Sequence, residues 1–423
     1  MREMKDSGNM WIGATPETWK MIPLKYLASY NDEVLSENTD DEFEFDYIEI
    51  GSVQYGRGII YTEHMKFKNA PSRARRIVRK DDIIVSTVRT YLKAVATIPA
   101  CNNSLIASTG FIVIRPHKVL PRFMNYALLS ESFISLVESH STGISYPAIN
   151  SVDVVKFKIP VPCRSEQERI AAFLDAECAE IDTVLEKTRA SIEEYKKLKQ
   201  AVITQAVTKG IRGDRPMKDS GIEWIGAIQK DWGSNTIAQL CSQVKCKNTR
   251  LQEKNLLSLS YGKVKRKSID TVEGLLPESF DGYNIIEKDD IVLRLTDLQN
   301  DHTSLRVGLA EERGIITSAY LTIRNRSNMC TKYLYYYLHS FDIAKGFYGM
   351  GAGVRQGLNW DGVKWLKVLV PSVSEQEHIV AFLDAESKKL DALIAKKQQY
   401  LTEIENYKKS LIYEYVTGKK EIV

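Results

Sequence analysis

Residues 165–177 read Ser-Glu-Gln-Glu-Arg-Ile-Ala-Ala-Phe-Leu-Asp-Ala-Glu, and residues 374–386 read Ser-Glu-Gln-Glu-His-Ile-Val-Ala-Phe-Leu-Asp-Ala-Glu. The two stretches lie 374 − 165 = 209 positions apart, which is about half of the 423-residue chain. Solenoid repeats recur every ~20–50 residues, so a repeat of this length indicates two copies of a whole module. The chain is therefore expected to be a duplicated, two-part protein.

The start of each copy repeats as well. Met-Lys-Asp-Ser-Gly at residues 4–8 returns at residues 217–221. Between these edges and the long repeat the match is weak but keeps its phase, since Lys-Asp-Asp-Ile at residues 80–83 returns at residues 288–291. The order along the chain is edge, variable body and helix, and then the same three again. The edges and helices kept their sequence while the bodies diverged.

Each repeat predicts a long helix. Ser165 and Ser374 are expected to cap the first turn, with Glu168 and Glu377 reaching back from three residues later as in a capping box. Apolar residues then recur at steps of three and four, the spacing of a coiled-coil stripe. The stripe positions are Ile170, Leu174, Ile181, Val184, Ile192, Tyr195, Leu198 and Val202, and then Ile379, Leu383, Leu390, Leu393, Leu401, Ile404, Tyr407 and Leu411.

An exposed apolar stripe needs a partner, and the other copy is the obvious one. We expect the two helices to pair antiparallel, with the stripe positions as their core and the C-terminus near the N-terminus. From Ser165 to Thr208 a helix would be roughly 65 Å long at about 1.5 Å per residue.

These elements predict an α+β fold, with two mixed α/β bodies joined by two long antiparallel coiled-coil helices in a pseudo-two-fold internal repeat. Within the bodies, helices are expected at residues 121–137 and 331–345. The predicted boundaries are 1–163 for the first body, 164–209 for the first long helix, 210–372 for the second body and 373–418 for the second long helix.

The charge is segregated although the net charge is only +4. Residues 28–50 hold nine acids and no Lys or Arg, whereas residues 55–93 hold ten Lys and Arg against three acids. In the second body, residues 243–268 hold eight Lys and Arg against one acid. A single basic stretch is usually a solvated surface, but one in each copy favours a nucleic-acid face.

Catalytic and cofactor motifs are sparse. Phe-Tyr-Gly-Met-Gly at residues 347–351 matches the F-x-G-x-G pattern of S-adenosylmethionine loops in DNA methyltransferases. It stands just before the second long helix, with no room for a nucleotide-binding fold after it and no N-P-P-Tyr/Phe tetrapeptide in the chain. We therefore interpret it as a loop near DNA, and we predict no catalytic, cofactor-binding or metal-binding residues.

The remaining composition bounds the class of protein. The six cysteines form no C-x-x-C pair and the six histidines lack metal-ligand spacing, so neither a disulfide framework nor a zinc site is predicted. No apolar stretch approaches membrane-spanning length, and no signal region precedes the first copy. The sequence predicts a soluble, cytoplasmic protein without a membrane partner.

The Lys-Asp-Ser-Gly and Trp-Ile-Gly edge, the Pro-x-x-Ser-Glu-Gln-Glu helix start and the Ser-Thr-Val-Arg-Thr-Tyr-Leu-Lys stretch at residues 86–93 carry a family resemblance. In combination they resemble the specificity subunit of type I restriction-modification systems, and the resemblance covers essentially the whole chain. It implies that the bodies are two target-recognition domains, each reading half of a bipartite double-stranded DNA site. It also implies a non-catalytic chain that docks two methyltransferase subunits and restriction/translocase subunits. S-adenosylmethionine, ATP and Mg would sit on those partners.

Long polar side chains read base edges and cations hold phosphates, so candidate DNA contacts come from the basic and polar loops. In the first body they are Tyr55, Arg57, Arg73, Arg75, Arg76, Arg89, Tyr91, Lys93, Ser145 and Tyr146. In the second body they are Lys245, Arg250, Tyr261, Lys263, Lys265, Arg266, Arg294, Asp297, Gln299, Asn300, Arg355 and Gln356. For each one the alternative is a solvated cation or a strand-end partner. In particular, Arg89 could pair with Asp82 and Arg294 with Asp290.

The family resemblance also implies where partner subunits dock. We expect exposed polar residues at the two helix starts, Gln167, Glu168, Gln376 and Glu377, to lie near the methyltransferase contact. The alternative function is a coiled-coil protein-interaction adaptor without sequence-specific DNA reading. That alternative does not readily explain two divergent basic bodies.

Overall fold

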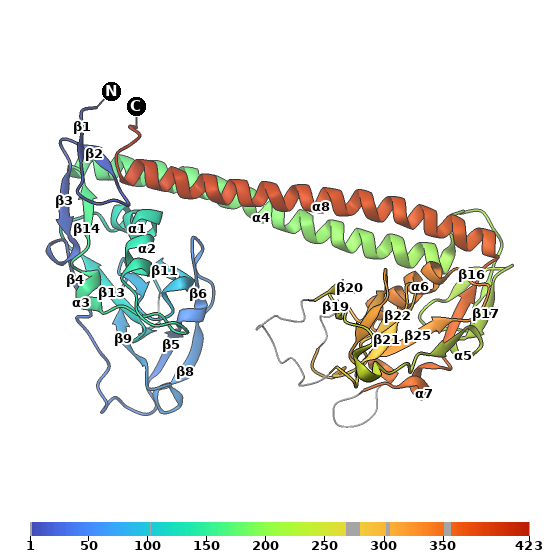
Figure 1. Cartoon of the computed structure of the whole chain (residues 1–423). Coiled ribbons are helices and arrows are strands. Elements are labelled where there is room, and N and C mark those ends of the chain that lie inside the picture. The colour runs from blue at the N-terminus through green and yellow to red at the C-terminus, as the bar shows by residue number, and fades with distance from the viewer. Residues whose placement is uncertain (1, 102, 268–279, 302–304, 351–356, 423) are drawn as a thin grey trace. The chain divides into compact units, whose positions relative to one another are not determined.

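The structure is a computed structural model that describes residues 2–101, 103–267, 280–301, 305–350 and 357–422. The chain divides into two compact units (Figure 1). The first unit holds residues 1–189 and 399–423, and the second holds residues 190–398. Each unit therefore combines one body with the start of its own long helix and the end of the other one.

Two four-stranded sheets form the first body. The first sheet has the antiparallel order β11 (Val95–Thr97), β10 (Ile83–Ser86), β13 (Phe111–Pro116) and β4 (Ala28–Tyr30). The second has the order β8 (Glu63–Lys66), β5 (Glu44–Ile48), β12 (Leu105–Ser108) and β9 (Ala74–Val78), in which β12 and β5 run parallel. Ile83, Ile84 and Val85 are all buried, because β10 is covered on both faces.

Short elements surround these sheets. The strand pairs are β1 (Met4–Asp6) with β2 (Ala14–Pro16), β3 (Lys20–Pro23) with β14 (Lys158–Val161), and β6 (Val53–Gln54) with β7 (Gly58–Ile59). The helices are α1 (Pro121–Leu129), α2 (Glu131–Ser139) and α3 (Ser151–Val154). The single helix expected at residues 121–137 is thus wrong. Its break is at Ser130, whose backbone is extended with ψ 145° and whose hydroxyl donates to the Ala127 carbonyl at 2.6 Å.

The second body is built around one four-stranded antiparallel sheet. Its order is β18 (Cys241–Gln243), β25 (Leu321–Asn325), β22 (Ile291–Leu293) and β23 (Val307–Leu309). The strand pairs are β15 (Met217–Asp219) with β16 (Ala227–Gln229), β17 (Gly233–Thr236) with β26 (Lys367–Val370), β19 (Leu257–Ser260) with β20 (Lys263–Arg266), and β21 (Asn284–Ile286) with β24 (Gly314–Ile316). The helices are α5 (Ile237–Leu240), α6 (Thr331–Ile343) and α7 (Trp360–Val363).

The two bodies share one sheet order. The order β4-β13-β10-β11 in the first body is repeated by β18-β25-β22-β23 in the second. Both copies place a buried aliphatic run in the same strand of this order, Ile83-Ile84-Val85 in β10 and Ile291-Val292-Leu293 in β22. The mixture of sheets and long helices is that of the α+β class.

The long helices are α4 (Arg164–Lys209) and α8 (Val373–Val416). Ser165 and Ser374 lie inside the first turns, so their predicted role as caps is wrong. The Ser372 hydroxyl instead accepts from the backbone N–H of Glu375 at 3.3 Å. Glu168 does not reach back to a cap but pairs with Arg164 at 3.1 Å.

Each unit contains an antiparallel piece of the helix pair. In the first unit, Lys408 Nζ binds the Asp182 carboxylate at 2.6 and 2.8 Å, and Arg189 binds Glu405 at 2.6 Å. Residue numbers rise along α4 as they fall along α8, so the two segments run antiparallel. In the second unit, Lys199 Nζ binds the Asp391 carboxylate at 2.7 Å. This pair stands 209 positions from Asp182 and Lys408 and corresponds to them.

The predicted stripe is only partly a core. Leu174 and Leu383 are fully buried near the helix starts, but Val184, Leu198, Leu393 and Tyr407 are exposed. Two helices alone offer a narrow seam, and the neighbour of Val184, Leu185, lies inward in its place. The expectation that every stripe position packs internally is therefore wrong.

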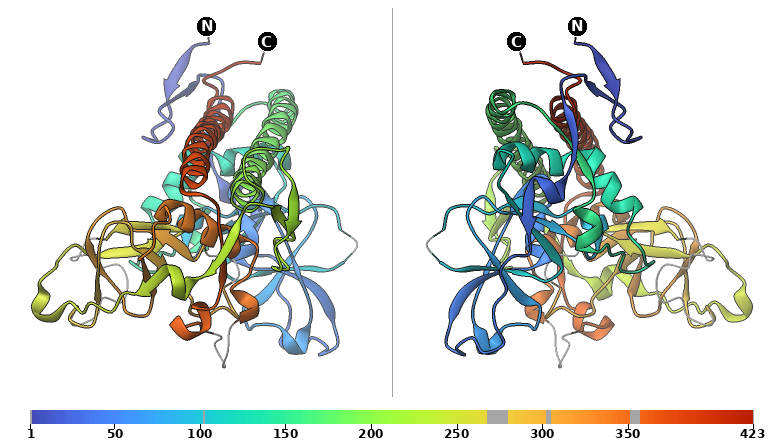
Figure 2. Two further views of the ribbon diagram at one scale, coloured as in Figure 1. Left: turned by 90° about the vertical axis from the view of Figure 1, so that its right-hand side faces the viewer. Right: turned by 90° about the vertical axis from the view of Figure 1, so that its left-hand side faces the viewer.

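The two termini lie close together in the first unit, at the end of the helix pair seen end-on in Figure 2. Arg2 pairs with Glu421 at 3.3 Å, and the Tyr413 hydroxyl donates to the Ile12 carbonyl at 3.1 Å. None of the described helices combines the length and the apolar character needed to cross a membrane.

Candidate nucleic-acid interface

The repeated Ser-Glu-Gln-Glu motif joins each edge to its helix. In the first unit, the Glu166 carboxylate accepts from Trp19 Nε1 at 3.0 Å and also pairs with Arg2. Trp19 is almost fully buried, so its indole N–H needs this acceptor. The counterparts in the second unit are Glu375, Trp232 and Arg215, with distances of 3.2 Å to the indole and 3.1 Å to the guanidinium.

The glutamine of the motif is also used inside the chain. The Gln167 side chain accepts from the backbone N–H of Leu120 at 2.9 Å and donates to the Pro162 carbonyl at 2.9 Å. Gln376 does the same with Cys330 and Pro371, both at 2.8 Å. Both glutamines are buried, so the expectation that they are exposed for docking is wrong. Glu168 and Glu377 are exposed.

The aspartate of the Phe-Leu-Asp repeat binds the body. Asp175 accepts from the Tyr126 hydroxyl at 2.9 Å and pairs with Arg122 at 2.6 Å, both on α1. The counterparts in the second unit are Asp384, Tyr336 and Lys332, at 2.7 Å and 2.6 Å. Burial and this carboxylate raise the pKa of Tyr126 well above its usual range. The repeated aspartates therefore fix each body to its own helix.

Two loops of the first body meet beside the end of β10. We call residues 87–93 and 141–149 the first loop pair. The Ile149 backbone N–H donates to the Thr87 carbonyl at 2.9 Å, and the Arg89 guanidinium lies over the Tyr146 ring at 5.2 Å. Arg89, in the left-handed region with φ 54°, is exposed, and so is Tyr146. Tyr91 and Ser145 are exposed as well, so this pair brings four predicted site residues to one surface.

Lys93 belongs to the same loop, but its side chain forms ion pairs with two glutamates. Its ammonium lies 3.4 Å from Glu138 and 3.9 Å from Glu131, both on α2. These carboxylates reduce the charge that Lys93 can offer to a phosphate.

The second body has a matching arrangement. We call residues 294–301 and 357–359 the second loop pair. The Leu358 backbone N–H donates to the Leu295 carbonyl at 2.8 Å. This bond corresponds to the one from Ile149 to Thr87 in the first body, which has nearly the same length. Asp297 has φ 56°, which repeats the left-handed backbone of Arg89 at a separation of 297 − 89 = 208 positions.

The polar side chains of this pair contact one another. Arg294 lies 3.5 Å from Asp301, and Asn300 donates to Asp297 at 2.8 Å. Gln299 is exposed. Arg355 and Gln356 lie outside the described residues.

The alternative partners considered for Arg89 and Arg294 are occupied by other arginines. Asp82 is bound by Arg115 at 2.8 and 2.9 Å, and Asp290 is bound by Arg324 at 2.7 Å. Both carboxylates are almost fully buried, and the strand β13 or β25 supplies the arginine. This alternative is therefore wrong for both loop arginines.

Three predicted arginines lie on or beside β9, which belongs to a different four-stranded sheet of the first body from β10. Arg73 lies 3.7 Å from Glu49, and the Arg75 guanidinium stacks on the Phe67 ring at 4.9 Å. Arg76 is half-buried, and burial lowers its pKa. Its Nε is buried without a hydrogen-bond partner.

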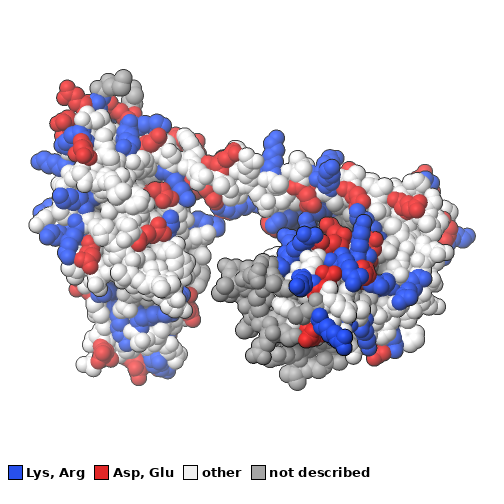
Figure 3. Space-filling model, viewed as in Figure 1, with Lys and Arg blue, Asp and Glu red and all other residues white. Residues whose placement is uncertain are grey.

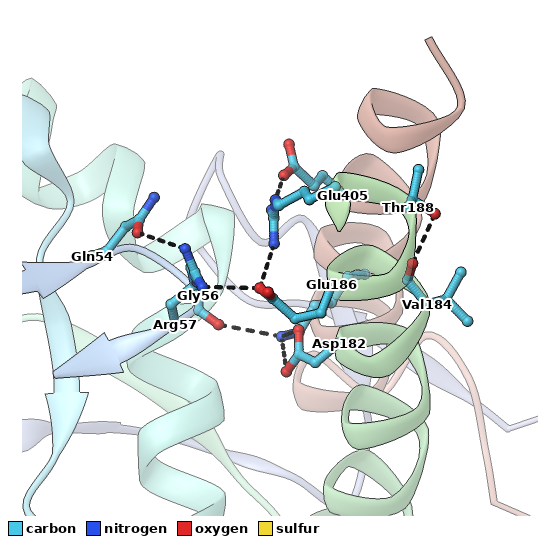
Figure 4. A network of polar contacts seen from close by, with 10 residues as sticks. Gln54, Gly56, Arg57, Asp182, Val184, Glu186, Thr188 and Glu405 are labelled. Carbon is cyan, nitrogen blue, oxygen red and sulfur yellow. Dashed lines mark hydrogen bonds and ion pairs between the residues drawn. The ribbon is translucent and has the colours of Figure 1, made fainter. Parts of the chain in front are cut away.

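Tyr55 and Arg57 face the helix pair of the first unit. The Tyr55 hydroxyl donates to the Leu129 carbonyl at 2.9 Å, and burial raises its pKa well above the usual range. Figure 4 shows Arg57 between Gln54 and Glu186, at 3.4 and 2.9 Å. In the same view the Gly56 carbonyl points toward the Asp182 site, where it accepts from Lys408 at 3.3 Å. Arg57 and the Gly56 carbonyl therefore hold the β6–β7 hairpin to the long helices, whereas Tyr55 holds it to α1.

The basic candidates of the second body are mostly exposed. Tyr261 is 86% exposed at the β19–β20 turn, and Lys263 and Lys265 are exposed on β20. Arg266 pairs with Glu312, and Lys245 and Arg250 are exposed beyond β18. On the face drawn in Figure 3, Lys and Arg residues gather on the second body among scattered acids. These cations suit phosphate contacts, because phosphates are read by charge and position.

Three comparisons place the chain among known proteins. The family model of the type I restriction modification DNA specificity domain matches residues 16–194. The MjaX specificity subunit of Methanocaldococcus jannaschii is 23% identical over 425 residues, covering 96% of this chain and 95% of that protein. The type I restriction enzyme MjaVIII specificity subunit of the same archaeon is 23% identical over 426 residues, covering 96% and 93%.

A solved chain from a type I restriction-modification system has the same fold, with a TM-score of 0.70. It is 19% identical, and the match covers 96% of this chain and 99% of that one. The family model covers the first body and the start of α4, whereas both relatives and the solved chain extend over both copies. Residues 16–194 thus match the type I restriction modification DNA specificity domain, and over both copies the chain is similar in sequence to type I restriction enzyme specificity subunits.

Proposed function

We propose that this chain is a specificity subunit whose two bodies each read one half of a two-part DNA target. The observation that carries this proposal is that the first loop pair and the second loop pair correspond in position. They stand at the ends of corresponding strands, β10 and β22, and are held by corresponding backbone hydrogen bonds. Their sequences differ completely, Thr-Val-Arg-Thr-Tyr-Leu-Lys against Arg-Leu-Thr-Asp-Leu-Gln-Asn-Asp. One frame with two different loops suits two different half-sites.

The exposed side chains of the loop pairs supply the base contacts in this proposal. Arg89 can bind a guanine through two donors, and Tyr146 keeps its guanidinium in place by stacking. Asn300 and Gln299 carry the donors and acceptors that suit adenine. The remaining exposed cations, such as Lys263 and Lys265, contact phosphates.

The long helices set the spacing between the half-sites in this proposal, and the full fold is a pseudo-two-fold repeat with an antiparallel coiled coil. Support comes from the cross-helix pairs Asp182–Lys408 and Asp391–Lys199, which correspond under the 209-residue repeat. The exposed Glu168 and Glu377 at the two helix starts lie where two methyltransferase subunits dock, one at each copy. The chain contributes no catalysis, and S-adenosylmethionine, ATP and Mg belong to the methyltransferase and restriction/translocase partners.

Mapping of modified bases by long-read sequencing, with and without this gene, tests the proposal. A two-part adenine-methylated motif that disappears on deletion is the expected result. A motif that has one part, or a methylome that does not depend on the gene, would contradict it. The protein-interaction adaptor remains the second candidate, and it predicts that exchange of the two loop pairs leaves every methylated sequence unchanged.

A further inference from the structure

The second body has a longer connection between two neighbouring strands than the first body has at the corresponding place. Residues 87–94 connect β10 to β11, whereas residues 294–306 connect β22 to β23. The longer connection carries more backbone carbonyls beyond the strand ladder, and each needs a donor if it is buried. A loop without such donors would not hold one conformation.

Arg306 supplies those donors. Its side chain is fully buried, at 0% exposure. All five N–H groups of a guanidinium can donate in a fixed planar fork. The acceptors are the carbonyls of Arg294 at 3.0 Å, Thr296 at 2.8 Å, Asp297 at 3.3 Å and Asp301, and the Tyr348 hydroxyl at 3.1 Å.

Tyr348 extends this cluster from the other side. It belongs to the Phe-Tyr-Gly-Met-Gly stretch, and its hydroxyl donates to the Asp301 carbonyl at 3.0 Å while its ring lies 5.1 Å from the Arg306 guanidinium carbon. Phe347 is fully buried in the core. Tyr348, anchored by its buried neighbour Phe347, thus supports residues 294–301.

The backbone of Arg306 is held as well. Its N–H donates to the Asp342 carboxylate on α6 at 2.6 Å. A buried cation costs stability unless its donors are satisfied, and a hydrophobic residue in its place is often as stable. Stability alone therefore does not account for Arg306, whereas its specific effect is to fix four carbonyls of one loop.

We propose that Arg306 is the positioning residue of the second reading loop. Its guanidinium, supported by Tyr348, fixes the backbone of residues 294–301 and so the directions of Arg294, Asp297 and Asn300. Arg306 itself touches no DNA. This inference rests on the proposed function, because it assigns a role within the second half-site.

The test compares three variants in the assembled methyltransferase complex. Arg306→Lys keeps the charge but loses the fork, and Tyr348→Phe removes one hydroxyl. Arg324→Lys is the matched control, since it removes the two-point guanidinium contact with Asp290 in the same body without touching the loop. Binding is measured against DNA libraries randomised at one half-site at a time. The second half-site is the one that Arg89→Ala leaves intact.

Arg306→Lys should lower base discrimination at the second half-site tenfold or more and leave the first half-site unchanged. The dependence of binding on salt should stay the same, because no phosphate contact is lost. Tyr348→Phe should show the same asymmetry more weakly, and it decides the matter if Arg306→Lys does not fold. Unchanged discrimination, an equal loss at both half-sites, or the same relaxation in Arg324→Lys would overturn the inference. A wild-type complex without a two-part target would instead refute the proposed function.

Discussion

Lengthening both long helices at corresponding points tests whether they set the half-site spacing. Arg189 and Gln398 lie 398 − 189 = 209 positions apart, and the boundary between the two units falls directly after both. The change inserts a copy of residues 186–189 after Arg189 and a copy of residues 395–398 after Gln398.

This choice of position protects the contacts inside each unit. Asp182 and Lys408 both lie in the first unit, and Lys199 and Asp391 both lie in the second. The added residues fall between the two sets, so neither ion pair changes register. An insertion into α4 alone would shift one helix against the other and break the correspondence.

The size of the effect follows from helix geometry. Four residues add about 6 Å of length at about 1.5 Å per residue, and about 400° of rotation, which is ~40° beyond a full turn. A base pair of B-DNA rises about 3.4 Å and turns about 34–36°. The rise corresponds to about two base pairs and the rotation to about one, so the spacer should lengthen by one to two base pairs.

The assay is the methylated motif of cells that carry the lengthened chain as their only specificity subunit. Both half-site sequences should persist while the unspecified spacer between them grows. An unchanged spacer, or altered half-site bases, would refute the reasoning. The same four residues inserted after Asn38, in an exposed loop of the first body, should leave the motif as it is.

Three further outcomes are expected. Arg89→Ala should relax one position of the first half-site by roughly 1–3 kcal/mol in competition binding, since a base-reading arginine is lost, and a uniform loss across all sequences would assign it to phosphate instead. Lys265→Ala should weaken binding to every sequence and lower the slope of log K against log salt by about one. Burial lowers the pKa of His339 to about 4, so the folded state resists protonation and stability is lost as pH falls from about 6.5 to 4, by at most about 3 kcal/mol. His339→Gln should flatten this loss of stability in urea unfolding. Asp342 acts in the opposite direction, because burial raises its pKa to about 6 and the stability it contributes is therefore lost as pH rises over much the same range.

The sequence predicted the parts of the fold that repeat. Two copies of the same letters predicted two long helices, and corresponding contacts such as Trp19–Glu166 and Trp232–Glu375 occupy both copies. The role of the repeated glutamines was not predicted, because polarity indicates a hydrogen bond but not its partner. Gln167 binds a backbone N–H from residue 120, and no residue type marks that atom.

The candidate site was predicted as a set of residues but not as a surface. Arg89 and Tyr146 stand 57 positions apart, and only the sheet brings them to 5.2 Å. The role of Arg306 could not be predicted from the sequence for a related reason. It is a single arginine before a strand, and its acceptors are mainly carbonyls, which every residue carries. A buried cation solvated by backbone leaves no pattern in the sequence.

The duplication separates what each copy must keep from what it is free to change. The conserved side chains, Glu166, Gln167 and Asp175 with their counterparts, fix each body on its helix. If the two half-sites must be presented at a set spacing, these contacts cannot vary without moving a whole reading surface. The loops on the strand ends face no such limit, since a change there alters the bases read and not the spacing. The connection between β22 and β23 could therefore become five residues longer than the connection between β10 and β11, provided that a residue such as Arg306 arose to hold it.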